Sequence, residues 1–209
     1  APLMAKTTSP KLHLQYAKAK EAQKQYKDAI VSYEKAQDYD SVVRLYLNHL
    51  DDAPKAFAIV RKSKTTGGAE LIAQYCQKTG DISAAIEFLL MSKQTAAALE
   101  LAKAHEMMDP FAFALGDNGT QEDLLAVAQY YEQKGDADKA GQFFAKTGQY
   151  AKALDLFLKC DERALDRAID VVGLARNESL THKLIDFLMG ETDAVPKDPK
   201  YIFRLYMAL

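Results

Sequence analysis

The chain has 209 residues, of which 48% are hydrophobic, and its 27 basic and 29 acidic residues give a formal net charge of −2. This composition excludes a wholly disordered chain, and the balanced charge argues against nucleic-acid binding, which usually needs a basic face. No apolar run approaches the roughly 20 residues that span a bilayer, so no direct membrane insertion is expected. Two cysteines do not make a disulfide framework and indicate a reducing, cytoplasm-like compartment.

Short helices are predicted along almost the whole chain, after a flexible lead-in at residues 1–8. Ser9-Pro10 predicts an N-cap followed by proline at the first helical position. Thr120 and Asp123 predict a capping box, in a weaker form because glutamate or glutamine is the usual partner. Breaks between helices are predicted where glycines interrupt the helix formers, at residues 67–68, 79–81, 134–136 and 147–149.

A spacing of small, large and small residues recurs along these helices. A small residue is followed by a large apolar residue at i+4 and by another small residue at i+7, positions that share one helix face. The small residues let a neighbouring helix approach, and the large one fills the gap between helices. The four clear copies are Ala29–Tyr33–Ala36, Ala85–Leu89–Ser92, Ala140–Phe144–Thr147 and Ala153–Phe157–Cys160, and weaker copies begin at Val42, Ala56, Ala69 and Ala98.

The spacing of these copies predicts the fold class. First positions follow one another at steps of 13 to 16 residues, enough for about ten helical residues and a tight turn. Helix pairs therefore recur about every 27–29 residues, which is shorter than the 34 residues of a tetratricopeptide unit. The sequence predicts an all-α, tetratricopeptide-like α-solenoid of short antiparallel helix pairs, a scaffold whose long faces bind partners. We expect one continuous array over residues 1–209, belonging to a longer protein.

Residues 105–120 interrupt the repeat and are predicted to form an irregular loop between repeat blocks. Met107, Met108, Phe111 and Phe113 place much apolar surface there. One interpretation is a protrusion that binds a partner through these four side chains. The other is a short helix in the solenoid core with residues 116–119 as its exit turn, and it is favoured because apolar side chains are usually buried.

No residues are predicted to carry out chemistry. His13, His49, His105 and His182 are far apart and no Cys-x-x-Cys motif occurs, so no metal, cofactor or catalytic set is expected. Cys160 holds a small position of the repeat and is interpreted as a packing residue. The lysines of residues 18–27 are interleaved with acidic residues and are interpreted as a solvated helix face.

Five blocks resemble the C-terminal helical region of the intraflagellar transport protein 144 family, whose members are also called WD repeat-containing protein 19. The blocks cover residues 10–21, 88–93, 148–160, 184–190 and 196–209, and the first and last are the most specific. The resemblance implies β-propellers before a long solenoid in the whole protein, and this chain shows no propeller pattern. The cysteine-rich extreme C-terminus of the family is also absent, and the family has no catalytic residues to carry over.

The resemblance also implies a function. Family members are subunits of intraflagellar transport complex A, which serves retrograde ciliary traffic and the entry of membrane cargo. The expected partners are the other subunits of that complex and cargo adaptors. The expected location is the cytoplasmic side of the cilium or flagellum and its basal body.

Three other functions stay open from the residues alone. A chaperone adaptor that clamps a terminal carboxylate is disfavoured because the chain has only three asparagines. A solenoid segment of a vesicle-coat-type trafficking protein shares the periodicity, and only the two end blocks separate it from a transport subunit. An enzyme would need a convergent polar cluster in a closed pocket.

The last stretch, residues 201–209, is apolar and lacks a glycine cap, so we expect further helices in the parent protein. Tyr201, Leu205 and residues 207–209 are predicted to present the open surface, with Phe203 and Tyr206 packed inward.

Overall fold

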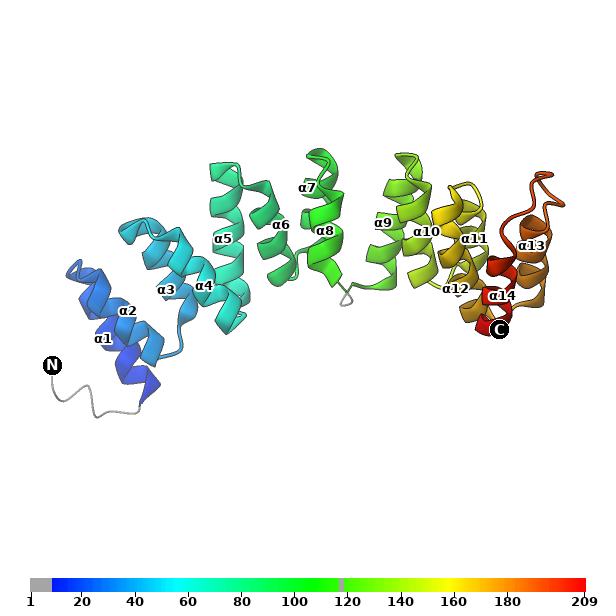
Figure 1. Cartoon of the computed structure of the whole chain (residues 1–209). Helices are drawn as coiled ribbons and strands as arrows, with labels where there is room; N and C mark the ends of the chain where they lie inside the picture. The colour runs from blue at the N-terminus through cyan, green and yellow to red at the C-terminus, as the bar shows by residue number, and fades with distance from the viewer. Residues whose placement is uncertain (1–8, 117–118) are drawn as a thin grey trace. The chain divides into compact units, whose positions relative to one another are not determined.

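The computed structural model describes residues 9–116 and 119–209, and the chain divides into two compact units, Ala1–Leu115 and Gly116–Leu209. The described residues of both units contain helices and turns but no strand. The predicted all-α, tetratricopeptide-like fold of short helix pairs is therefore confirmed (Figure 1). The expected flexible lead-in, residues 1–8, lies outside the described residues.

The first unit is a stack of short helices in which neighbours in sequence pack on one another. Its elements are α1 (Pro10–Ala22), α2 (Tyr26–Lys35), α3 (Tyr39–Leu45), the π-helical turn η2 (Tyr46–Leu50), α4 (Ala53–Ser63), α5 (Thr66–Thr79), α6 (Ile82–Met91), α7 (Thr95–Ala104) and α8 (Met108–Leu115). Helix α1 packs on α2, α3 contacts both α4 and α5, and α6 contacts α5, α7 and α8.

The second unit is built in the same way. Its elements are α9 (Gln121–Gln133), α10 (Ala137–Lys146), α11 (Tyr150–Phe157), the 3-10 turn η4 (Glu162–Ala164), α12 (Leu165–Ala175), α13 (Glu178–Leu188) and α14 (Pro199–Ala208). Helix α10 packs between α9 and α11, and α12 contacts α11, α13 and α14. A Cβ atom on Gly141 would lie 2.7 Å from the Phe157 ring, so glycine is what allows α10 and α11 to approach here.

The same type of turn connects six pairs of consecutive helices in the described residues. A residue with positive φ separates the C-cap of one helix from the N-cap of the next, at Lys24, Gln37, Lys93, Glu106, Gly135 and Gly148. In the turn at Gly148, the glycine N–H donates to the carbonyl of Ala145 (3.0 Å) and the Gln149 N–H donates to that of Phe144 (3.0 Å). These two bonds satisfy the free carbonyls of the ending helix, in a Schellman-type arrangement. The repeat thus includes the connection as well as the helix face.

Some local signals were correct and one was wrong. Helix α1 begins at Pro10 with Ser9 at the N-cap position, although the Ser9 side chain makes no capping hydrogen bond. The Thr120–Asp123 capping box forms in both directions. The predicted break at residues 67–68 does not exist, because Gly67 and Gly68 lie in the first turn of α5. Asp40 of α3 reaches this turn: its carboxylate accepts from the Gly68 N–H (2.7 Å), and a Cβ on Gly67 would lie 2.8 Å from its Cγ. A Cβ on Gly68 would lie 3.0 Å from the Val60 side chain, so both positions favour glycine.

The predicted irregular loop at residues 105–120 is corrected, and the favoured interpretation of a short buried helix in this segment is confirmed. Residues 108–115 form α8, which packs on α6 and α7. The helix forms because Met108, Phe111 and Leu115 are spaced to bury one face. The expected exit turn includes residues 117 and 118, which lie outside the described residues. Continuity of the array from one unit to the next stays a prediction.

Candidate protein-binding surfaces

The residues of the small–large–small pattern lie mainly inside the two units. The four first positions, Ala29, Ala85, Ala140 and Ala153, are fully buried. The large residues at the second positions are buried as well, namely Tyr33, Leu89, Phe144 and Phe157. These residues hold helices together and leave the partner-binding surface to other side chains.

The residues at the third position of the pattern lie at helix ends, and not on the packed helix face that the spacing suggests. Ala36, Ser92 and Thr147 are the C-cap residues of α2, α6 and α10, and they are half-buried. The Ser92 hydroxyl donates to the Leu89 carbonyl (2.9 Å), and the Thr147 hydroxyl donates to that of Phe144 (2.8 Å). Cys160, interpreted as a buried packing residue, follows α11 and is only half-buried, and its thiol donates to the Leu156 carbonyl (3.3 Å). The third position therefore ends the helix, and a small or hydroxyl-bearing side chain suits it.

A charged network joins the first three helices. Arg44 of α3 donates two hydrogen bonds to the Glu21 carboxylate (2.7 and 3.0 Å), and the Tyr33 hydroxyl donates a third (2.7 Å). The bonds from Arg44 hold the pKa of Glu21 below its usual value. Burial, together with the bond to Glu21, raises the pKa of Tyr33 to about 12. The network is a structural clamp, because every charged group in it has a protein partner.

The four apolar residues considered for partner binding are divided by the structure. Met108 and Phe111 are buried in the face of α8 that packs on the unit, as the favoured interpretation predicts, so the partner-binding alternative is wrong for these two side chains. Met107 is half-buried, whereas Phe113 points outward with 91% of its surface exposed. Phe113 is therefore the member of this set that offers a partner the most surface.

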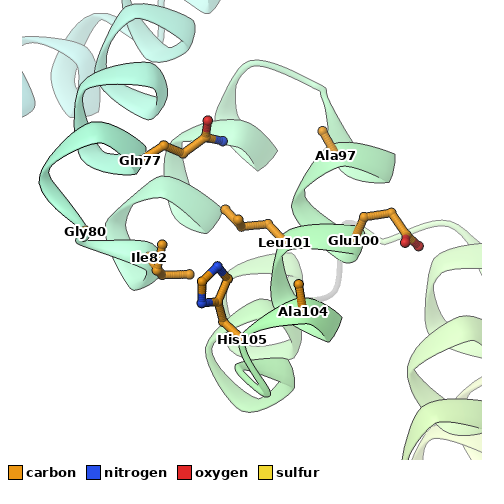
Figure 2. Close-up of a pocket in the computed structure, with 8 residues that line it drawn as sticks. All are labelled: Gln77, Gly80, Ile82, Ala97, Glu100, Leu101, Ala104 and His105. Atoms are coloured by element: carbon orange, nitrogen blue, oxygen red, sulfur yellow. The ribbon is translucent and has the colours of Figure 1, made fainter.

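An open groove lies on the first unit (Figure 2). It has a volume of about 700 Å³ and is formed by the end of α5, the start of α6 and one side of α7. Its apolar part consists of Ile82, Leu101 and two small residues of α7, Ala97 and Ala104. Its polar groups are Gln77, Glu100 and His105.

The groove was missed in the sequence, although one signal was available. Ala97 and Ala104 are seven residues apart and so lie on the same side of α7. Such a spacing also marks buried contacts, and only the structure shows these two alanines lining an open surface.

Helix α14 presents an apolar outer face, but with a different set of residues from the predicted one. Tyr201 and Leu205 are buried, whereas Phe203 and Tyr206 are exposed, so the prediction is wrong for these four. The helix is rotated so that Tyr201 and Leu205 pack inward, and the Arg204 guanidinium beside them pairs with Asp166 and Asp170 of α12. The exposed face therefore consists of Phe203, Tyr206, Met207 and Leu209.

The described residues offer no cluster for chemistry. Residues 9–116 and 119–209 contain no group of three or more His, Cys, Asp or Glu side chains placed to hold a metal ion. Burial raises the pKa of the Cys76 thiol to about 11 and also raises the pKa of Cys160, which makes both poor nucleophiles at neutral pH. No helix in this part of the chain is long and apolar enough to cross a bilayer.

Comparison with known proteins finds close relatives along the whole chain. The family described as the TPR domain of intraflagellar transport proteins 140 and 172 matches residues 2–193. WD repeat-containing protein 19 from Mus musculus and from Homo sapiens are each 47% identical to the chain over 212 residues. WD repeat-containing protein dyf-2 from Caenorhabditis elegans is 39% identical over 209 residues.

These matches cover 99% of the chain but only 15–16% of each relative, so the chain spans about a sixth of their length. The names of the relatives confirm the resemblance that the five sequence blocks predicted.

Proposed function

Because the chain belongs to the family of the intraflagellar transport 140 and 172 TPR domain, we propose that it is a non-catalytic scaffold segment in intraflagellar transport. The observation that carries this proposal is the 47% identity to WD repeat-containing protein 19 over 99% of the chain. Identity at that level over the whole array supports a shared surface as well as a shared fold, since helical repeats retain their spacing at much lower similarity.

The finer part of the proposal concerns the complex. The chain is proposed to belong to a subunit of intraflagellar transport complex A, to contact the other subunits of that complex and cargo adaptors, and to act in retrograde transport and cargo entry. The corresponding location is the cytoplasmic side of the cilium and its basal body. Exposed apolar groups support a binding role: Phe113, the outer face of α14 and the groove beside α7 are all accessible to a second protein.

The same proposal includes that the chain does not act as an enzyme. The Glu21 carboxylate of the first unit is engaged by Arg44 and Tyr33, so it is not available as an acid or a base. The groove beside α7 is open and lined by few polar groups. An acid, a base and a closed pocket are the parts that an enzyme would need.

An affinity pull-down from an extract of ciliated cells tests the proposal. The tagged 209-residue chain should recover subunits of the transport complex, identified by mass spectrometry. A matched chain with Phe113→Ser and Ala104→Glu should recover less of at least one subunit, because both changes alter exposed apolar surface without entering the core. Recovery of vesicle-coat proteins without transport subunits would favour the vesicle-coat alternative and overturn the proposal.

A further inference from the structure

The first helix pair carries an excess of lysine. Helices α1 and α2 with their turn, residues 10–35, hold six lysines and three acidic residues, a formal net charge of +3, while the whole chain carries −2. Five of these lysines are exposed, and one of the five, Lys35, follows Glu34 in the last turn of α2. The other four lie on α1, in the turn and at the start of α2, and we call them the lysine patch: Lys11, Lys18, Lys24 and Lys27. Across residues 9–116, none of the four forms an ion pair.

One of the acidic residues near this patch in sequence, Glu21, is turned away from it. Glu21 lies between Lys18 and Lys24 in sequence, which suggests a balanced, solvated face. In the structure both of its oxygens are occupied by Arg44 and Tyr33, from α3 and α2. Lys20 is also occupied, since its ammonium donates to Gln25 (2.5 Å) and lies over the Tyr16 ring. Asp28, exposed in the first turn of α2, is the acidic residue that stays beside Lys27, so the four lysines of the lysine patch keep a net positive charge.

One side of α1 carries exposed polar and small side chains. Lys11, Gln15, Lys18 and Ala22 are spaced i, i+4, i+7 and i+11, so they form one stripe along the helix, and all four are exposed. Lys11 and Lys18 lie about 10 Å apart along the axis, at about 1.5 Å per residue. Lys24 and Lys27 continue the charge through the turn into α2.

We propose that the lysine patch is a docking surface for an acidic segment of a partner protein. Charge complementarity identifies the occupant: a segment with glutamates or aspartates spaced to meet Lys11 and Lys18 would neutralise the patch. The stripe lacks the large apolar side chains with which a surface helix enters a lipid interface, so it fits a protein segment better than a membrane. This inference rests on the proposed scaffold role and names one face of it.

Binding of a fluorescein-labelled oligoglutamate peptide to the full 209-residue chain tests the proposal by fluorescence anisotropy. The chain should bind the peptide at low ionic strength, and binding should weaken as salt is raised from about 50 to 200 mM. The variant with Lys11, Lys18, Lys24 and Lys27 all changed to Gln should bind about tenfold or more weakly. These side chains are exposed, and an unchanged far-UV circular dichroism spectrum checks that the variant is folded.

A matched variant separates the patch from general charge. Lys62, Lys78, Lys93 and Lys159 are also exposed and form no ion pair in the described part of the chain, and changing them to Gln removes the same charge. This control should retain most of the binding. Equal losses in the two variants, or no binding by the unmodified chain, would overturn the proposal.

The last measurement in the test is binding of the chain and its variants to vesicles of phosphatidylserine and phosphatidylcholine. If the patch variant loses vesicle binding but keeps peptide binding, the patch is a membrane site and the proposal is wrong. Failure of the peptide assay leaves the scaffold role standing, because the pull-down measures that role through other surfaces.

Discussion

The second position of the repeat pattern carries a tyrosine in one copy of the first unit and a phenylalanine in one copy of the second unit. In the first unit Tyr33 follows Ala29, and its hydroxyl reaches Glu21 and thereby Arg44. In the second unit Phe144 follows Ala140, and its ring lies under the Lys152 ammonium, 4.1 Å from the centroid. Both rings are almost fully buried. The small residue decides how close the helices come, and the large position accepts a polar group wherever a neighbouring helix supplies a partner.

The strongest test of this comparison removes the large residue of the apolar site. Phe144→Ala should destabilise the chain by about 3–5 kcal/mol, because it deletes a buried ring and leaves a cavity. Urea unfolding followed by circular dichroism measures the loss. The control is Phe113→Ala, at an exposed ring, which should change stability by less than about 0.5 kcal/mol. Comparable losses in the two variants would mean that Phe144 is not a core residue.

Enlarging the small residue at the first position of the pattern should destabilise both units to a similar extent. Ala140→Leu and Ala29→Leu should each cost about 1–3 kcal/mol, because a larger side chain has no room at a fully buried helix contact. Thermal and urea unfolding measure both. Ala97→Leu, at an exposed alanine of α7, serves as the control and should have little effect. An unchanged melting midpoint for Ala140→Leu would count against the repeat alignment.

The polar site should show a pH dependence that the apolar site lacks. Tyr33→Phe should cost about 1.5 kcal/mol at neutral pH, because it removes a hydrogen bond to a carboxylate. The folded-state pKa of Tyr33 is raised to about 12 from its ordinary 10.0. The stabilisation from the neutral hydroxyl is therefore complete below about pH 10 and is lost as pH rises from about 10 to 12.

Urea unfolding at about pH 8 and at about pH 11, on either side of the ordinary tyrosine pKa, checks this expectation. The difference in stability between the unmodified chain and Tyr33→Phe should shrink at the higher pH. A difference that stays constant would show that the Tyr33–Glu21 bond does not contribute as described.

The smallest expected effect concerns the connecting turn, which also differs between the units. Gly148 in the second unit and Lys93 in the first both have positive φ, 77° and 64°. Gly148→Ala should cost about 1 kcal/mol, because a Cβ atom strains this conformation. Lys93→Ala should cost much less, since Lys93 already carries a Cβ. Equal losses of stability in the two variants, measured by urea unfolding, would show that backbone strain does not cause the effect of Gly148→Ala.

Much of the fold was readable from the residues because helix faces and turns are local. The burial of Ala29 and Ala140, the turn at Gly148 and the capping box at Thr120 depend on spacing within a few residues. Residues 108–115 were harder, since their apolar side chains fit both a protrusion and a buried helix. Contact with α6 and α7 decided the matter, leaving Phe113 on the outside of α8.

By itself, the sequence determined the helical class, the helix lengths and the small–large spacing, because these follow from the helical periodicity and turn chemistry. Only the tertiary structure decided which surfaces are free. Helix α14 is rotated so that Tyr201 and Leu205 pack inward and Phe203 faces outward. The capture of Glu21 by Arg44, 23 residues away, removes this carboxylate from the lysine patch. Both outcomes depend on side chains brought together from different helices, which periodicity along one helix does not encode.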